Sequence, residues 1–284
     1  MTPNGNVAQP SGTPKKRPSN FWLIIVAALF IIVPFLTWYL TWFGRSLSDE
    51  KIAEYLVDEK HPRNVQHALA QIEARMETAD PSVKKFYPRI VELAKSPVAE
   101  VRKTVAWVMG QDNTSEDFHR ALLELLRDPE PLVRRNAALQ LVRFGDASGR
   151  TELRAMLQSF EVKAPFSGTL VSLLGVGSNV RAGSLLARIR DGSSTVQEFR
   201  APVDGTIALP VAKEGEPAAA NQTIAWLRPE PASIDAALRA LAYVGTKDDL
   251  PLIESCAQAD GRRETADQAA LTAKAVRQRL TQAP

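Results

Sequence analysis

The distribution of hydrophobic and polar residues divides the chain into three patterns. An uninterrupted apolar run occupies residues 21–43, FWLIIVAALFIIVPFLTWYLTWF. A helical period follows, because apolar residues recur at i, i+3, i+4 and i+7 in 83–94 and in 115–127. Between 161 and 228, glycines, β-branched residues and turn dipeptides replace the helical period. The pattern predicts a multidomain α+β chain: one long apolar helix, then paired helices that flank an inserted β module at 161–228.

The apolar run has the properties of a transmembrane helix. It is 23 residues long and contains no Asp, Glu, Lys or Arg, whereas about 20 apolar residues suffice to cross a bilayer. Trp22 stands near one end and Trp38, Tyr39 and Trp42 near the other, where aromatic rings favour the headgroup region. A cleaved signal peptide is the alternative, but its apolar core is shorter and is followed by small residues. We therefore expect a single transmembrane helix at 21–43.

The charge of the chain sets its expected orientation. The net charge is +3, and Lys15, Lys16 and Arg17 account for the excess because acidic and basic residues balance after residue 43. Positive residues beside a first transmembrane helix stay in the cytoplasm. This predicts a single-pass protein with a disordered cytoplasmic tail at 1–20 and an exported body. Because a chain with one cysteine forms no internal disulfide, the expected location is the inner (cytoplasmic) membrane of a bacterium, with a periplasmic body. Because the body has no basic excess, nucleic-acid binding is not expected. The expected partners are the membrane, through 21–43, and an envelope protein of unknown identity.

A repeated helix pair is visible in residues 44–160. The dipeptides Asp80-Pro81, Ser96-Pro97 and Asp128-Pro129 interrupt the helical pattern at separations of 16 and 32 residues. The sequence VRKTVAWVMG at 101–110 recurs as VRRNAALQLVRFG, 32 positions later. Helix pairs that repeat at such a period stack into an α-solenoid.

These repeats resemble HEAT-like repeats over about 48–158, and the resemblance returns at 233–281 in ALRALAYVGTKDDLPLIE. The resemblance implies a shared core between paired helices and a surface that binds other proteins. The core residues expected in one repeat are Leu122, Leu125, Ala138 and Leu141. Arg134, at a recurring position after valine, is expected to bond a neighbouring turn.

The β module contains an internal repeat. The sequence APFSGTL at 164–170 matches APVDGTI at 201–207, and the offset of 37 becomes 38 after one inserted residue, so that Gly177 matches Gly215 and Leu186-Ala187 matches Ile224-Ala225. Two copies of strand–turn–strand predict two interlocked sheets related by a pseudo-two-fold axis. We expect positive-φ turns at Gly177, Gly183, Gly205 and Gly215.

Both copies resemble the barrel-sandwich hybrid fold of biotinyl and lipoyl carrier domains. The lipoyl-like domain of periplasmic adaptor (membrane fusion) proteins is similar. The resemblance implies that Ala164-Pro165 and Ala201-Pro202 begin equivalent strands, and that 190–198 is the exposed link between the halves. Carrier domains attach their cofactor to a lysine at this link, but RDGSSTVQE contains none. Adaptor proteins carry a long helical hairpin there, for which nine residues are too few.

The sequence predicts no catalytic, cofactor-binding or metal-binding residue. No G-x-S-x-G, Gly-rich phosphate loop, H-E-x-x-H or C-x-x-C motif is present. Cys256 is the single cysteine and is expected to be buried, and the three histidines, His61, His67 and His119, are too scattered for a metal site. The acidic pairs Glu116-Asp117 and Asp248-Asp249 are expected in the first turns of helices.

The predicted divisions are a tail at 1–20, a transmembrane helix at 21–43, HEAT-like helices at 44–160, the β module, and HEAT-like helices at 229–284. The expected function is a membrane-anchored, non-enzymatic scaffold or protein-interaction module of the bacterial cell envelope. The alternative is a shortened periplasmic adaptor-like accessory subunit of an efflux or secretion complex.

Overall fold

The structure is a computed structural model that describes residues 21–38, 46–259 and 262–282. The chain divides after Leu47 into two units, and each is described by itself. Of the sequence-based predictions, the tail at 1–20 and the ring residues Tyr39 and Trp42 lie outside the described residues.

The first unit contains one apolar helix, α1 (Phe21–Trp38), with Pro34 inside it. Within the described part of the chain, no helix is long and apolar enough to cross a membrane. The predicted transmembrane helix at 21–43 is therefore wrong, and the single-pass topology and inner-membrane location that depended on it fall with it.

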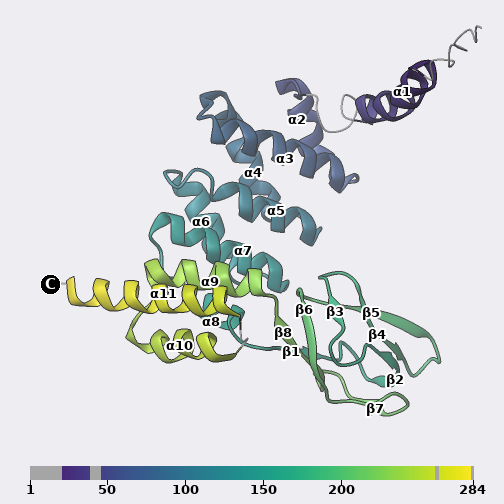
Figure 1. The fold of residues 1–284 in the computed structure, drawn as a ribbon, viewed down its shortest axis with the longest axis vertical. Coiled ribbons are helices and arrows are strands. Elements are labelled where there is room, and N and C mark those ends of the chain that lie inside the picture. The colour runs from purple at the N-terminus through teal and green to yellow at the C-terminus, as the bar shows by residue number, and fades with distance from the viewer. Residues whose placement is uncertain (1–20, 39–45, 260–261, 283–284) are drawn as a thin grey trace, which may run out of the picture. The chain divides into compact units, whose positions relative to one another are not determined.

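The second unit is built from helices in pairs, with a β module inserted among them (Figure 1). The helices are α2 (Asp49–Val57), α3 (Pro62–Glu77), η2 (Pro81–Phe86), α4 (Tyr87–Leu93), α5 (Ala99–Met109), α6 (Glu116–Leu125), α7 (Pro131–Leu141), η3 (Val142–Phe144), α8 (Arg150–Met156), α9 (Pro231–Val244), η4 (Lys247–Asp249), α10 (Leu250–Ala259) and α11 (Arg263–Gln282). In this helical stack α3, α5 and α7 contact one another in succession, and α2, α4 and α6 pack against them. After the β module, α9 packs against α8 and α11, and α10 packs against α11.

Local signals explain where the helices begin. Ser48 and Ser115 cap α2 and α6, because each hydroxyl accepts a hydrogen bond from the backbone N–H three residues on. Pro62, Pro131 and Pro231 occupy the first turns of α3, α7 and α9, where a missing N–H costs nothing. Glu116-Asp117 lies in the first turn of α6, as predicted.

The four residues predicted for the core of one repeat, Leu122, Leu125, Ala138 and Leu141, are all buried. Ala138 belongs to a cluster that does not include the three leucines. Buried residues of α7 and α8 form one cluster with residues of α9, α10 and α11, although the β module separates these helices in the sequence. The helical stack therefore continues across the insertion.

The β module spans eight strands, from Phe160 to Pro229. They are β1 (Phe160–Lys163), β2 (Gly168–Leu173), β3 (Asn179–Val180), β4 (Leu185–Arg190), β5 (Val196–Arg200), β6 (Gly205–Pro210), β7 (Pro217–Ala218) and β8 (Thr223–Pro229). They form two four-stranded antiparallel sheets with the orders β1-β8-β6-β3 and β5-β4-β2-β7. Because β1 pairs with β8, the two ends of the insertion lie side by side where the module meets the helical stack (Figure 1).

The two sheets are related by the internal repeat. In the repeat, β1 to β4 of the first half are equivalent to β5 to β8 of the second. When each strand is replaced by its equivalent, the order β1-β8-β6-β3 becomes β5-β4-β2-β7, which is the order of the other sheet. The hydrogen bonds repeat as well: Gly177 N–H donates to the Ile207 carbonyl (2.9 Å), and Gly215 N–H donates to the Leu170 carbonyl (2.7 Å). In the same way, Ala164 N–H donates to Gln222 and Ala201 N–H donates to Ser184, both at 2.8 Å. Each half thus bonds the other through equivalent atoms.

The glycines of the β module serve two different purposes. Gly177, Gly183 and Gly215 have positive φ, as predicted. Gly205 does not: it begins β6, and a Cβ there would lie 2.6 Å from the Arg228 carbonyl oxygen. Its repeat equivalent Gly168 would place a Cβ 2.4 Å from the Arg190 carbonyl oxygen. Close approach of two strands, and not a turn, excludes side chains at Gly168 and Gly205.

Two further details of the predicted module differ from the structure. Ala164-Pro165 and Ala201-Pro202 follow β1 and β5 and do not begin strands. The link between the halves is the turn at 191–195, because residues 196–198 belong to β5. The Asp191 carboxylate accepts hydrogen bonds from the backbone N–H groups of Ser193 and Thr195, which closes this hairpin locally. In architecture the chain is an α+β mixture with two antiparallel sheets.

Candidate interaction cleft between the helical repeats and the β module

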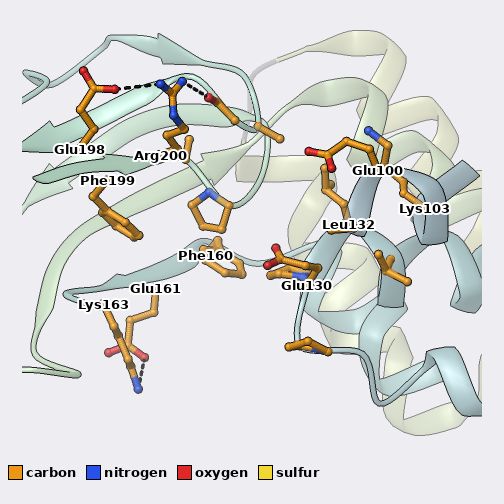
Figure 2. A pocket seen from close by; sticks show the side chains of 18 residues that line it. Glu100, Lys103, Glu130, Leu132, Phe160, Glu161, Lys163, Glu198, Phe199 and Arg200 are labelled. Atoms are coloured by element: carbon orange, nitrogen blue, oxygen red, sulfur yellow. Dashed lines mark hydrogen bonds and ion pairs between the residues drawn. The ribbon is translucent and has the colours of Figure 1, made fainter. Parts of the chain in front are cut away.

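A cleft of about 700 Å³ separates the helical stack from the β module. On the helical side it is lined by the first turns of α5 and α7, including Glu100, Lys103 and Leu132. On the β side it is lined by β1 and β5, including Phe160 and Phe199. Figure 2 shows these groups on opposite sides of an open space. The cleft therefore exists only because the two parts of the chain are joined in one structure.

Arginines hold the helical wall of the cleft in place. Arg102 Nη1 donates to the Ser96 carbonyl (2.8 Å), and Arg134 Nη1 donates to the Asp128 carbonyl (2.8 Å). These are equivalent contacts in consecutive repeats, and they confirm the expectation that Arg134 bonds a neighbouring turn. Arg102 also forms two charged hydrogen bonds with the Asp128 carboxylate, at 2.6 and 2.9 Å. The turns before α5 and α7 are thereby tied to each other as well as to their own helices.

The Asp128 carboxylate remains charged in this setting. Burial disfavours its charged form, but the hydrogen bonds from Arg102 and from the Glu130 backbone N–H outweigh burial, so the pKa of Asp128 lies below its usual range. The bond to Asp128 likewise raises the pKa of Arg102. The pair therefore persists at neutral pH and keeps the helical wall rigid.

Arg135 connects the helical stack to the β module beneath the cleft. Its side chain is only 4% exposed, lies 5.7 Å from the centre of the Phe160 ring, and approaches Glu152 of α8 at 3.7 Å. Burial lowers the pKa of Arg135, although the negative charges of Glu152 and Asp204 oppose this effect. Its Nε has no hydrogen-bond partner among the described residues. The buried guanidinium of α7 therefore lies between an aromatic ring of β1 and a carboxylate of α8, where the β module meets the helical stack.

The β wall presents a half-buried aromatic floor with charged residues beside it. Phe160 and Phe199 pack against the core of the β module. Arg200 donates to the Gly183 carbonyl (2.9 Å) and to the Glu198 carboxylate (2.8 Å), as Figure 2 shows. Lys163 pairs with Glu161 at 3.2 Å. The charges on this wall are thus largely neutralised within it.

The charged residues of the helical wall, unlike those of the β wall, are not paired with each other. Glu100, Glu130 and Lys103 make no ion pair within the described part of the chain. Glu100 lies in the first turn of α5, and Glu130 is the residue that precedes α7. Both carboxylates lie at helix N-termini, where negative charge is favoured, and neither is occupied by an ion pair with a described residue.

The residues singled out in the sequence do not converge on a reactive centre. Among the described residues, no group of three or more His, Cys, Asp or Glu side chains could hold a metal ion. Cys256 is buried, and burial raises the pKa of its thiol. His61 contacts Asp58, whereas His119 contacts Asp146 and stacks on Phe144, so the two are bound to different turns. The turn at 191–195 contains no amine.

Sequence reasoning did not find the cleft. Its helical wall is made of the segments that follow the dipeptides Ser96-Pro97 and Asp128-Pro129. In the sequence these dipeptides indicate only breaks between helices. The repeated Val-Arg sequence after each break was a usable signal, because it marks the turns that Arg102 and Arg134 fix.

Comparison with known proteins supports the repeat prediction. The HEAT repeat family matches residues 87–164. The chain therefore contains HEAT-like repeats. This match reaches from α4 to just beyond β1 and leaves 233–281 outside it.

No curated protein matches the chain. Among solved structures, a single-chain, multi-domain long-chain acyl-CoA carboxylase is 17% identical over 37% of this chain and 11% of that chain, with a TM-score of 0.23. The chain thus corresponds to a small part of that protein's length, and a likeness at this TM-score supports no conclusion about fold or function.

Proposed function

We propose that this chain is a non-enzymatic protein-interaction scaffold whose docking site is the cleft between the helical stack and the β module. The observation that supports the proposal is the composition of this cleft. The cleft is lined by the half-buried rings of Phe160 and Phe199 and by the unpaired side chains of Glu100, Glu130 and Lys103. Arg102 and Arg135 make contacts that support the two walls. Preformed walls reduce the ordering cost of binding, and helical repeats commonly provide extended binding surfaces.

We further propose that the β module is a biotinyl/lipoyl-like barrel-sandwich hybrid that has no carrier role. The matched strand orders and the reciprocal hydrogen bonds between its halves support this assignment. A carrier requires an amine on the link between the halves, and the turn at 191–195 provides none. The module instead supplies one wall of the cleft. Intact-mass measurement of the native protein tests this point, because a mass increase matching biotin or lipoate within the module would contradict it.

Site-specific photocrosslinking in the native host tests the scaffold proposal. A photoreactive amino acid replaces Glu130, which lines the cleft, in one variant. In the control variant it replaces Glu116, which lies at the start of α6, outside the lining of the cleft. Both positions are exposed acidic residues at helix starts, so they are matched. The proposal expects a protein crosslink from position 130 that is absent from position 116. Equal crosslinking from both positions, or none from position 130, would contradict it.

A further inference from the structure

The strand β5 is an open edge of its sheet. It pairs with β4 on one side, and its sheet has the order β5-β4-β2-β7. Apart from this ladder, no backbone hydrogen bond joins any residue from Val196 to Arg200 to another described segment. Alternate backbone N–H and C=O groups of β5 therefore face away from the sheet without a protein partner.

The longer outer strands of both sheets line the same cleft. The outer strands β3 and β7 are two residues long and offer no ladder. The longer outer strands, β1 and β5, both contribute residues to the cleft. Of these two, β1 is more covered, with one buried and two half-buried residues among four, whereas four of the five residues of β5 are exposed. β5 is the edge that remains accessible.

Natural sheet edges are commonly blunted by lysine, proline or extreme shortness. β5, with the sequence VQEFR, has no lysine and no proline and extends over five residues. Its two charged residues, Glu198 and Arg200, pair with each other, and the register irregularity of its ladder lies between Leu185 and Ala187, at the end paired with Arg200. Phe199 on β5 points into the cleft in Figure 2, and Pro202 also lines the cleft. This open edge therefore lies beside an apolar surface, within a cleft whose volume falls in the range of ligand sites, roughly 300–1,000 Å³.

The charges of the helical wall select the side chains of an occupant. Opposite β5, the carboxylates of Glu100 and Glu130 have no ion-pair partner in the described part of the chain. One ammonium group of this wall, that of Lys103, is also without an ion pair among the described residues, so the unpaired charges of the wall have a negative excess. The charges of β5 itself, on Glu198 and Arg200, pair with each other. An occupant with basic side chains is complementary to this excess.

We infer that the cleft binds an extended peptide segment of a partner protein, which adds to β5 as a further strand. The added strand places an apolar side chain on Phe199 and a basic side chain toward Glu100 and Glu130. Main-chain hydrogen bonds supply the affinity and the alternating side chains supply the specificity. This inference rests on the proposed scaffold function and specifies its partner: a basic, extended segment.

Binding of blocked hexapeptides to the full chain tests the inference. The probes alternate valine with lysine, with serine or with glutamate, each labelled for fluorescence anisotropy. The expected order of affinity is lysine, then serine, then glutamate. No binding of the lysine peptide at millimolar concentration, or equal binding of the lysine and glutamate peptides, would overturn the inference.

Backbone methylation separates strand addition from simple charge attraction. Two further lysine peptides carry N-methyl groups on either the odd or the even residues. An added strand pairs through one edge only, so one methylated peptide should lose binding and the other should retain it. If both methylated peptides still bind, backbone N–H groups are not used and strand addition is overturned. If both lose binding, N–H groups on both edges of the peptide are needed, which also contradicts an added strand.

Variants of the helical wall locate the binding site. Glu100→Lys and Glu130→Lys should each weaken the lysine peptide about two- to fivefold, whereas Glu116→Lys should leave binding unchanged. Amide NMR shifts should concentrate on β5. Shifts confined to the indole N–H signal of Trp107, an exposed residue of α5, would place the peptide elsewhere and contradict the inference. If peptides fail while the crosslink from position 130 persists, the scaffold proposal stands and the strand-addition inference falls.

Discussion

Arg154 and Asp249 form an ion pair, at 2.5 Å, between residues 95 positions apart in the chain. Arg154 lies on α8, just before the β module leaves the helical stack, and Asp249 lies in η4, after the chain has returned through α9. Asp249 is fully buried and also accepts hydrogen bonds from the backbone N–H and hydroxyl of Thr246. One carboxylate thus caps a helix and joins the two sides of the insertion.

Removal of this carboxylate should destabilise the helical stack. Asp249→Ala should lower the free energy of unfolding by about 1–3 kcal/mol, because buried N–H donors lose their acceptor. Asp248→Ala is the matched control: its side chain is exposed, and the expected change is below about 0.5 kcal/mol. Urea unfolding measures both. Equal effects from the two variants would show that the capping box and ion pair contribute nothing specific.

The same carboxylate predicts a dependence on pH. Burial disfavours charged Asp249, but the bonds from Thr246 and Arg154 prevail and hold its pKa below the ordinary value of 3.8. A depressed folded-state pKa means that the contribution to stability is present above 3.8 and is lost as pH falls through the lower, folded-state value. The stability difference between the wild type and Asp249→Asn should therefore shrink below pH 3.8. A difference that widens under acid would contradict this sign.

The repeat core gives a prediction about packing. Leu125→Ala should cost about 2–5 kcal/mol, because the side chain is buried between paired helices and its removal leaves a cavity. Leu271→Ala on α11 is the control, because that leucine is 62% exposed. Thermal or urea unfolding distinguishes them, and a cost near zero at position 125 would mean that the helix pair packs differently.

The paired glycines give a prediction specific to the pseudo-symmetry of the β module. Gly168→Ala and Gly205→Ala should both destabilise the module, because each new Cβ would meet a backbone carbonyl oxygen that cannot move freely. Gly192→Ala should be tolerated, since nothing lies within 4 Å of its added Cβ. Hydrogen exchange of strand amides measures the effect locally. Tolerance at one of the two sites alone would contradict their equivalence.

Excision of the β module should leave the helical stack folded. In this variant a short Gly-Ser linker replaces the segment from Phe160 to Pro229, whose terminal strands β1 and β8 are neighbours. The cluster shared by α7, α8 and α9 is then retained, and Arg135 gains access to water. Circular dichroism and hydrogen exchange should show α9 to α11 still protected. Loss of their protection would mean that the module is required to hold the two sides of the stack together.

Local sequence signals predicted the helices and the repeat well. Proline and serine at helix starts, and apolar spacing at Leu122 and Leu125, act over a few residues and can be counted in the sequence. The internal repeat of 37 and 38 residues likewise predicted two interlocked sheets, because equivalent sequences adopt equivalent strands. The divisions at residues 160 and 228 remain predictions about domains, although strands begin and end near them.

The failures came from features that sequence counting does not capture. The apolar run at 21–43 predicted a transmembrane helix, but no helix among the described residues is long and apolar enough to cross a membrane. Gly205 was assigned to a turn, since the sequence does not distinguish a positive φ from a close strand contact. The cleft and Arg135 were missed, because both depend on how the β module docks against α7. Asp249 lies in the first turn of η4, as predicted, but its ion-pair partner Arg154 was missed, because it lies 95 residues away in the sequence.

The exchange of strands between the halves of the β module has a consequence for its ancestry. Each sheet takes two strands from the first half and two from the second: β1 and β3 lie with β6 and β8, and β5 and β7 lie with β2 and β4. Neither half closes a sheet by itself. A chain carrying one half would have to associate with a second copy, by swapping strands, to bury the same core. The module has the architecture of such a swapped dimer fused into one polypeptide, with the turn at 191–195 as the point of fusion.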